Sequence, residues 1–556
     1  MLIYTDSVMI NKHRSSIKKF QVNLKLVEEH LSKGNHEEAV KYLLVAEGME
    51  PRNFAILNEI GTCYSKLGDN NKALIYHLKA HSISKDNPII LCNVGIDLQK
   101  LNRHQESIDY LKQSILIDPN NYMPYSGIAS NYHSLGDYVK LSKISIEALA
   151  LFPNISDFHV NLATALIGLN QYEQAAYCIE TALLLNPNSI DAKFNLARIL
   201  SLKYLSSDAV NAYEELLKSV VKFNNDLVPF IKYNLSFEYL KMGYLEKGWE
   251  YFESGFDSRI PFNKGRQPNR RFKVPLWLGE EGSQKSLLVW AEQGIGDEIL
   301  FMSLLKDLST KLIQVIVECD KRLVSIVKRS YPNFIVRSPH FDLNNDQLLF
   351  DYDYHIPMGS LPRLFRKKLS DFHPLRSYLV PRKLNNLELD IFFKENSKFL
   401  KIGICWRSGL LTNEREINYI PLSQWETIFS IPNAIFINLQ YGECEQELNE
   451  AEDIFNKKIH RWPFIDLKND LENTFMLIDQ LDLVITADTA VSPIAFSIGK
   501  PALTFSNEQG WANLGEKLYP WSSNMIPFTP KKDDPLQNIL LDISEYIKTN
   551  YTKILE

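Results

Sequence analysis

Three short polar segments of this sequence follow apolar runs, and each carries side chains that could take part in transfer chemistry. The segments are Ala291-Glu-Gln-Gly-Ile-Gly-Asp-Glu298, Trp406-Arg-Ser-Gly-Leu410 with Arg415 shortly after it, and Ile485-Thr-Ala-Asp-Thr-Ala-Val-Ser-Pro493. Glycines let a ligand approach the backbone closely, and a helix that begins after such a loop offers free N–H groups. A carboxylate can act as a general base, and a guanidinium can bind phosphate through two hydrogen bonds.

The first segment favours contact with a hydroxyl group. Gln293, Gly294 and Gly296 form its loop, and Asp297 and Glu298 stand where a helix is expected to begin. Acidic residues at this place commonly cap a helix and complement its dipole. Because two carboxylates would repel a phosphate, we expect this loop to meet a hydroxyl acceptor. Asp297 could then be either a cap or the general base for that hydroxyl.

The second and third segments are candidates for binding a diphosphate. Arg407 and Ser408 follow an apolar run, and a guanidinium matches phosphate oxygens in bidentate fashion, although a surface ion pair is the alternative. Asp488, Thr489 and Ala490 come at an expected strand end and helix start. Amides exposed there could bind phosphate, but the same residues also suit an ordinary helix cap.

These loops need strands and helices to position them, and the periodicity of the C-terminal half supplies both. Expected strands are 287–290, 312–317, 334–336, 400–406, 434–439 and 483–486, and expected helices are 298–308, 321–329, 425–429, 474–480 and 489–498. Strands that alternate with helices form mostly parallel sheets. Since 382–399 separates two such groups, the pattern predicts two Rossmann-like domains, 285–381 and 400–556 with a C-terminal helix, whose strand-end loops line a cleft.

The N-terminal half repeats every 34 residues. Mostly small residues recur at three places, which are Val27, Gly61, Gly95, Ala129, Ala163 and Ala197; Ala39, Ala73, Ser107, Leu141, Ala175 and Ala209; and Ala46, Ala80, Ser114, Ala148, Ala182 and Leu216. Small residues let paired helices approach closely. A Gly or Asn seven residues after five of the anchors is suited to the positive φ of a helix end, at Gly34, Gly68, Asn102, Gly136 and Asn170.

This pattern resembles the tetratricopeptide repeat family. The resemblance implies an α-solenoid of about seven repeats over 20–256, with a groove that binds a protein segment or a surface used only for scaffolding. An irregular seventh repeat over 233–252 is expected to cap the solenoid and pack against the next domain. The fold class is therefore α plus α/β.

Two further segments and the composition complete the expectations. Residues 1–19 form a polar, basic leader without the apolar core of a signal peptide, and 257–284 form a basic linker that is either a solvated surface or faces an anionic ligand. A net charge of −6 disfavours a nucleic-acid-binding face. The six scattered cysteines suggest reduced core residues, and no apolar run is long enough to span a membrane. We expect a cytoplasmic protein.

Several motifs together resemble the GT-B glycosyltransferases. They are Gly296-Asp297, Asp488-Thr489, Gly499-Lys500-Pro501, Asp353-Tyr-His-Ile-Pro-Met-Gly-Ser-Leu-Pro362 and Asn438-Leu-Gln-Tyr-Gly442. The bacterial branch in question includes lipopolysaccharide heptosyltransferases and tetratricopeptide-linked transferases. By this resemblance Asp297 is the catalytic base, Gln293, Gly294, Gly296 and Glu298 lie on the acceptor side, and Arg407, Ser408, Gln440, Asp488, Thr489 and Ala490 bind the donor.

The resemblance implies an inverting enzyme without metal or cofactor that transfers a sugar from a nucleotide sugar to Ser or Thr of a protein, with a flagellin-type acceptor suggested. One departure leaves alternatives open. Ser492-Pro493 stands where the heptosyltransferases carry a histidine. The alternatives are a non-catalytic adaptor with a degenerate transferase domain and a heptosyltransferase-like enzyme that acts on a glycolipid.

Overall fold

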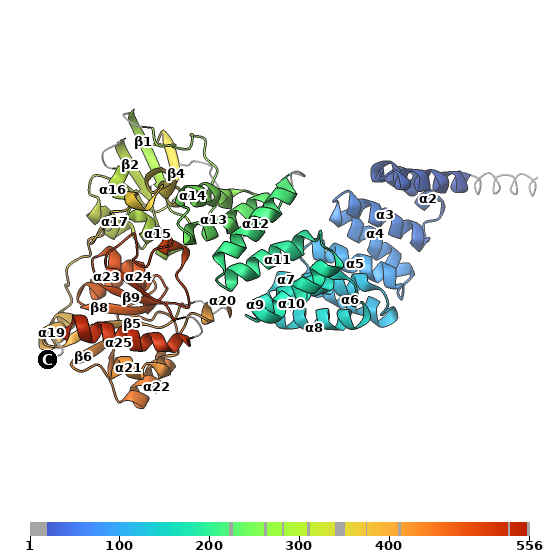
Figure 1. The fold of residues 1–556 in the computed structure, drawn as a ribbon. Helices are drawn as coiled ribbons and strands as arrows, with labels where there is room; N and C mark the ends of the chain where they lie inside the picture. The colour runs from blue at the N-terminus through green and yellow to red at the C-terminus, as the bar shows by residue number, and fades with distance from the viewer. Residues whose placement is uncertain are drawn as a thin grey trace, which may run out of the picture. The chain divides into compact units, whose positions relative to one another are not determined.

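The computed structural model describes residues 19–221, 226–260, 264–280, 283–308, 312–339, 351–373, 375–409, 413–531 and 534–552. The chain divides into two compact units, Met1–Ile199 and Leu200–Glu556, whose elements are labelled in Figure 1. This division falls inside the repeat array, whereas the sequence placed a boundary after residue 256. The predicted leader, 1–19, lies outside the described residues except for its last position.

The first unit is a solenoid of paired antiparallel helices. After a helix over 19–32 come α2 (His36–Met49), α3 (Phe54–Lys66), α4 (Asn70–Ile83), α5 (Pro88–Lys100), α6 (His104–Ile117), α7 (Tyr122–Leu135), α8 (Tyr138–Leu151), α9 (Ser156–Gly168) and α10 (Tyr172–Leu185), and α11 (Ile190–Leu202) crosses the unit boundary. All eighteen positions aligned by the 34-residue spacing are buried. The helix-ending residues Gly34, Gly68, Asn102, Gly136 and Asn170 all have positive φ, which confirms the predicted turns.

The second unit begins with the last repeat helices and continues into a parallel sheet. The helices are α12 (Ser206–Val221), α13 (Val228–Lys241) and α14 (Leu245–Phe252), followed by η1 (Glu253–Phe256). The first sheet contains β1 (Ser283–Trp290), β2 (Leu312–Glu318), β3 (Ile335–Arg337) and β4 (Tyr354–Pro357) in the order β3-β2-β1-β4. All its pairs are parallel, with Val289 opposite both Val317 and Ile356. Helices α15 (Ile295–Met302), α16 (Leu305–Leu308), α17 (Val324–Ser330) and α18 (Leu361–Phe365) accompany it.

A second parallel sheet completes this unit after α19 (Leu387–Glu395). Its strands are β5 (Leu400–Cys405), β6 (Ala434–Asn438), β7 (Ile459–His460), β8 (Leu483–Ala487), β9 (Ala502–Phe505) and β10 (Met525–Phe528), in the order β10-β9-β8-β5-β6-β7. The helices are α20 (Asn413–Glu416), α21 (Glu426–Phe429), α22 (Glu445–Phe455), α23 (Leu471–Asp479), α24 (Val491–Ser497) and α25 (Ile539–Asn550). The predicted parallel sheets are confirmed, whereas β7, β9 and β10 were not predicted because their apolar runs are short.

In both sheets the strand order reverses at one point, between β1 and β4 and between β5 and β8. Ligands of open parallel sheets bind at the carboxyl ends of the strands beside such a reversal. The loops after β1, β5 and β8 are those that carry the predicted site residues. The fold therefore places the predicted residues at the positions where parallel sheets ordinarily bind ligands.

The last repeat hairpin shares an apolar core with both sheets. Trp249 of α14 is buried and packs edge-on against Trp511 and Trp521, which come from the loop that joins β9 to β10. Phe301 of α15 contacts the same two tryptophans. The indole N–H of Trp249 donates to the carbonyl of Arg366. Because these contacts join the hairpin to the sheets, the compact unit begins before the repeats end.

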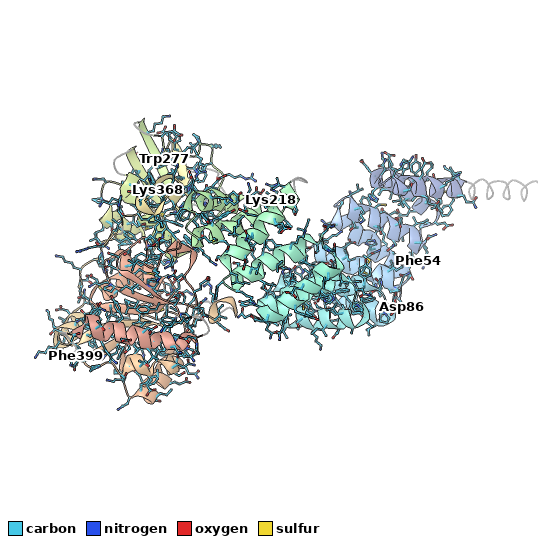
Figure 2. The ribbon with its side chains drawn as sticks, in the orientation of Figure 1. Phe54, Asp86, Lys218, Trp277, Lys368 and Phe399 are labelled. Carbon is cyan, nitrogen blue, oxygen red and sulfur yellow. The ribbon has the colours of Figure 1, made fainter. Side chains whose placement is uncertain are left out.

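Part of the segment between the hairpin and β1 also belongs to this core. Four of its basic residues are nevertheless exposed, as the solvated-surface alternative expects: Arg259, Lys264, Arg271 and Lys273. Trp277, labelled in Figure 2, is fully buried. Its backbone N–H donates a hydrogen bond to the carbonyl of His355 at the outer edge of β4. Arg266 is fully buried against Glu292, and Arg270 pairs with Glu318 at 2.8 Å. These two arginines therefore bind carboxylates inside the protein and face neither solvent nor an anionic ligand.

Candidate functional site

The carboxyl ends of the two sheets meet where α15 contacts α24. A Cβ atom built on Gly296 would lie 3.7 Å from Cα of Ala490 and 3.7 Å from Cγ of Pro493. Gln293 and Gly294, which precede α15, are exposed. The structure thus brings the predicted acceptor-side loop against the predicted donor-side residues that follow β8.

Asp297 lies in the first turn of α15 and is half-buried. Burial raises the pKa of Asp297 to about 6, and the nearby carboxylates of Glu292 and Asp488 act in the same direction. The N–H of Gly294 and the guanidinium of Arg415 oppose them. A carboxyl group with this pKa is ionised above neutral pH, yet it is basic enough to accept a proton from a hydroxyl group as that group reacts.

The segment after β8 presents Asp488 and Thr489 next to Asp297. Asp488 is exposed, and the desolvation caused by the surrounding protein raises its pKa. The Thr489 hydroxyl lies 3.2 Å from Oγ1 of Thr486 and accepts a hydrogen bond from the N–H of Val491 at 3.3 Å. Thr489 is therefore held by the start of α24, as a cap residue would be. Tyr519 is electrostatically coupled to the same two carboxyl groups. Burial and the charges of Asp488 and Asp297 raise the pKa of Tyr519 well above the usual range.

The guanidinium that acts on Asp297 belongs to Arg415 of α20. Its Nη1 donates to Oγ of Ser408 at 3.1 Å, and its charge lowers the pKa of Asp297. The Arg415 residue is exposed. Ser408, predicted as a donor-binding residue, thus positions this arginine from the loop after β5.

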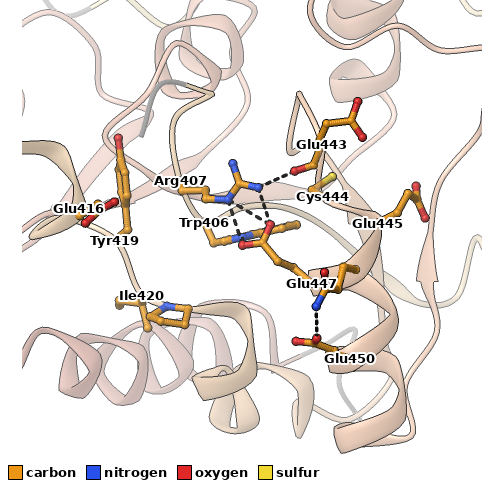
Figure 3. Close-up of a pocket in the computed structure, with 12 residues that line it drawn as sticks. Trp406, Arg407, Glu416, Tyr419, Ile420, Glu443, Cys444, Glu445, Glu447 and Glu450 are labelled. Atoms are coloured by element: carbon orange, nitrogen blue, oxygen red, sulfur yellow. Dashed lines mark hydrogen bonds and ion pairs between the residues drawn. The ribbon is translucent and has the colours of Figure 1, made fainter. Parts of the chain in front are cut away.

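Arg407 has surroundings different from those predicted. Its Nε donates to both carboxylate oxygens of Glu447, and its Nη2 donates to the same carboxylate and to the carbonyl of Glu443 at 2.7 Å (Figure 3). The Arg407 side chain is 12% exposed, so the pair with Glu447 is partly shielded from water. The alternative of an ion pair therefore describes Arg407 better than a diphosphate contact.

The pocket beside Arg407 is acidic. It has a volume of about 760 Å³ and is lined in part by Glu416, Glu443, Glu445, Glu447 and Glu450 (Figure 3). Carboxylates repel a diphosphate, and Arg407 is the pocket's single basic lining residue. Arg407 is thus paired with Glu447 beside an acidic pocket, and its donor-binding role stays a prediction.

Two further predicted residues support the loops from inside the protein. Glu298 is buried, and its Oε1 accepts the N–H of Asp320, after β2, at 2.7 Å. Burial raises the pKa of Glu298 to about 8. Gln440 is 1% exposed, and its side chain bonds to the N–H of Arg407 and to the carbonyl of Tyr441. Glu298 is therefore held away from solvent, whereas Gln440 also lines a second pocket, and its donor-binding role stays a prediction.

Sequence reasoning missed two residues that surround the Asp297 loop. Glu292 is buried beside Asp297 and receives Arg266. Tyr233 of α13 is buried, and its pKa is raised by burial and by the charges of Glu292 and Asp297. The first helix of the last repeat hairpin, α13, thus contributes a side chain near Asp297. The acidic segment containing Glu292 was visible in the sequence, but nothing local connected it to a repeat or to an arginine 26 positions earlier.

A second pocket, of about 460 Å³, opens at the carboxyl ends of β6 and β7. Its lining includes Tyr441, Trp462, Arg461 and Lys468. Arg461 bonds to Glu445 and Glu452, whereas Lys468 is exposed. This pocket offers aromatic faces together with charges of both signs, since Glu445 and Asp466 line it as well as Arg461 and Lys468.

Comparison with known proteins identifies the repeats. A profile described as "Tetratricopeptide repeat" matches residues 90–121 and 156–189, so the N-terminal solenoid consists of tetratricopeptide repeats. The chain is 27% identical over 310 residues to Protein FlbA of Caulobacter vibrioides, in an alignment that covers 53% of this chain and 50% of the relative. The match thus spans about half the length of this curated relative.

Solved structures resemble parts of the chain. A tetratricopeptide repeat protein from Parabacteroides merdae is 15% identical, with 42% of this chain and 91% of that chain covered and a TM-score of 0.37. For pilF of Pseudomonas aeruginosa the identity is 15%, 37% of this chain and 93% of that chain are covered, and the TM-score is 0.33. For MamA of Desulfovibrio magneticus the identity is 19%, 31% of this chain and 97% of that chain are covered, and the TM-score is 0.30.

Membrane-spanning and metal-binding features were sought in the same residues. Within the described ranges, every helix is too short or too polar to cross a membrane. The described histidine, cysteine, aspartate and glutamate side chains form no group of three or more that could hold a metal ion.

Proposed function

We propose that this protein is a GT-B glycosyltransferase that moves a sugar from a nucleotide-sugar donor to a hydroxyl group of a protein acceptor. The observation that carries the proposal is the position of Asp297. This carboxyl group has a pKa of about 6, follows the strand at which the first sheet reverses, and is set against the loop at the reversal of the second sheet. Such an arrangement suits a base that serves a ligand held between two parallel sheets.

In the proposed reaction the acceptor hydroxyl attacks the anomeric carbon of the donor. Its proton moves to the Asp297 carboxylate, a new glycosidic bond forms, and the bond between the anomeric carbon and the diphosphate oxygen breaks. The electron pair of the broken bond leaves with the nucleoside diphosphate. Attack from the face opposite the leaving group inverts the anomeric centre. A base held next to the reacting hydroxyl is favoured over solvent because the reaction geometry is fixed in advance.

The leaving diphosphate is assigned to Arg415. Among the guanidinium groups discussed, Arg415 acts on Asp297 and is exposed, whereas Arg407 is bound to Glu447. Asp488 and Thr489 would contact the sugar or its first phosphate. The nucleoside fits the pocket that contains Tyr441, Trp462 and Lys468, since aromatic rings can cover a base and the ammonium group can meet a ribose or phosphate oxygen.

The repeats supply the preference for a protein acceptor. Tetratricopeptide arrays act mainly by binding other chains. In this protein the last repeat hairpin is part of the unit that contains both sheets, and Tyr233 of that hairpin lies near Asp297. An acceptor segment bound to the last hairpin would therefore end beside the proposed base. The transferred sugar and the identity of the acceptor, including the suggested flagellin type, follow from no residue on this side of the molecule.

The proposal is tested by incubating the full-length protein with a panel of nucleotide sugars and an extract of acceptor proteins, and by measuring mass additions to those proteins. Asp297→Asn should lower transfer by at least about 100-fold, the lower range for loss of a general base. Donor binding, measured by calorimetry, should stay within a few-fold. Arg415→Ala should instead weaken donor binding, while Arg407→Ala should leave it nearly unchanged and lower the stability of the second unit.

Two results would contradict the proposal. Equal transfer by the wild-type protein and Asp297→Asn would remove the base from its role. If no nucleotide sugar of the panel binds and no protein gains mass, the chain acts as a non-catalytic adaptor. Mass addition to a glycolipid and not to a protein would replace the acceptor class and would leave the assignment of Asp297 intact.

A further inference from the structure

A buried arginine joins the last repeat hairpin to the loop that carries Asp297. The Arg266 side chain is fully buried, and its guanidinium carbon lies 4.4 Å from the ring centre of Phe252 and 4.1 Å from that of Phe256. Two aromatic faces on a planar cation restrict it to one orientation and shield it from water. The edges of the guanidinium are therefore left to bind partners in that fixed plane.

Those partners come from three separate segments. Nε and Nη2 of Arg266 donate to the two carboxylate oxygens of Glu292, which follows β1, so this ion pair is bidentate. Nη1 donates to Glu253 of η1 at 2.9 Å. Nη2 also donates to Oγ of Ser360, after β4, at 3.1 Å, and that hydroxyl donates to Glu253 at 2.7 Å. The network thus links the end of the repeats to the loops at the reversal point of the first sheet.

The backbone around Arg266 holds the same loop. The carbonyl of Gln267 accepts the N–H of Gln293 at 2.7 Å, and Gln293 has a φ of +66°. A non-glycine residue adopts such a φ only where its surroundings impose it. The N–H of Gly359 donates to Oε1 of Glu292 at 3.0 Å, and a Cβ atom on Gly359 would fall 2.3 Å from that oxygen. Space and hydrogen bonds together fix Glu292 and Gln293.

We propose that Arg266 is a positioning residue that holds the Glu292 side chain and fixes the loop over 291–294, and thereby sets the position of Asp297 relative to the Glu292 carboxyl group. This inference rests on the proposed function only for its consequence in catalysis. Burial opposes the charge of Arg266, but Glu292 and Glu253 outweigh it and raise the pKa of the guanidinium. Because Arg266 holds the Glu292 side chain beside Asp297, the Glu292 group acts to raise the pKa of Asp297.

Several other groups act on Asp297 and must stay unchanged in the test. Asp488 and Arg415 act on the charge of Asp297, and Asp297 in turn acts on Tyr519 and Tyr233. Tyr233 also interacts with Arg266 and Glu292, so substitutions at those two positions change its surroundings as well. The described contacts of Arg266 do not include Asp488, Arg415 or Tyr519.

The first measurement is a carboxyl ¹³C NMR titration of the full-length protein labelled on aspartate, with Asp297→Asn used to identify the signal. The Asp297 midpoint is expected near pH 6 in the wild-type protein. Glu292→Gln removes the like charge and keeps an acceptor for Gly359, so the midpoint should fall by about one pH unit. An unchanged midpoint in Glu292→Gln would overturn the inference. Where transfer is observed, its acidic limb should move with the midpoint.

The second measurement is amide hydrogen exchange of the conservative variant Arg266→Lys, which keeps the charge and removes the planar fork. Exchange in the segment 291–297 should accelerate at least about tenfold, because the ammonium group cannot hold Glu292 and Glu253 in the same geometry. Arg259→Ala is the matched control, since Arg259 is exposed, lies in the same segment and forms an ion pair with the partly exposed Asp257. Equal exchange in Arg266→Lys and Arg259→Ala would overturn the inference.

These measurements need neither donor nor acceptor. Failure of the proposed transfer reaction would leave both NMR and exchange results readable, and failure of either result would leave the transfer assay unaffected. If Glu292→Gln does not fold, the exchange of Arg266→Lys decides the inference alone.

Discussion

Replacing Glu298 with glutamine should make the second unit more stable, and the gain should grow with pH. Glu298 is 5% exposed, and burial raises its pKa from an ordinary 4.5 to about 8. Its Oε1 accepts the N–H of Asp320, a contact that a glutamine carbonyl can keep. The variant therefore removes the ionisation and retains the hydrogen bond.

The sign and size of the effect follow from the raised pKa. Below pH 4.5 both the folded and unfolded states carry the proton, so the ionisation costs no stability. Between pH 4.5 and pH 8 the unfolded state releases the proton first, and the wild-type protein loses stability by about 1.4 kcal/mol per pH unit. The full loss above pH 8 is on the order of 5 kcal/mol. Glutamine escapes this loss, so its advantage at pH 9 should exceed that at pH 5 by about 4 kcal/mol.

The assay is thermal unfolding of both proteins at pH 5 and pH 9. At roughly 2 cal/mol/K per residue over Leu200–Glu556, 4 kcal/mol corresponds to a shift of about 5 °C in the second unit's transition. Comparing the two pH values cancels any constant cost of burying the glutamine NH₂ group. Glu246→Gln on the exposed face of α14 is the control and should show no such dependence. An equal advantage at both pH values would refute the placement of Glu298 in a buried, proton-holding position.

Two predictions concern the units separately. Trp249→Ala removes a buried indole that contacts Trp511 and Trp521, so the unfolding transition of the second unit should lose about 3–5 kcal/mol while the transition of residues 1–199 stays in place, as calorimetry can resolve. Gly68→Ala forces a side chain onto a φ of +81° and should lower the stability of the first unit by about 1–2 kcal/mol. Gly48→Ala, at a helical position with open space, should raise it by up to about 1 kcal/mol, and a loss there equal to that of Gly68→Ala would contradict the backbone argument.

The elements of both units could be predicted because they depend on local patterns. All the positions that the 34-residue spacing aligned are buried, and the Gly and Asn residues that end the solenoid helices have the positive φ that their type suggests. Strands such as Leu400–Cys405 and Leu483–Ala487 were found as continuous apolar runs, since both faces of a parallel strand are buried. The short strands β7 and β9 carried too few residues to be recognised, although the three-residue β3 was predicted to within one position.

The candidate site was predictable as a set of loops and not as a set of contacts. Asp297 and Asp488 each follow a strand beside the reversal of its own sheet, a rule that acts on strand order, and the contact of α15 with α24 brings the two loops together. The partners of the charged side chains follow no such rule. Arg407 and Arg415 stand eight positions apart, yet one binds Glu447 of α22 and the other acts on Asp297.

The sequence alone therefore determined the tetratricopeptide solenoid, the parallel sheets and the loops that carry the site residues, because periodicity and strand order are properties of neighbouring positions. Only the tertiary structure decided that Glu298 accepts the N–H of Asp320 inside the protein, that Arg407 pairs with Glu447 while Arg415 donates to Ser408, and that Arg266 is buried against Glu292. The physical reason is that a charge pairs with whichever opposite charge the fold brings within a few ångströms, and those partners come from segments distant in the chain.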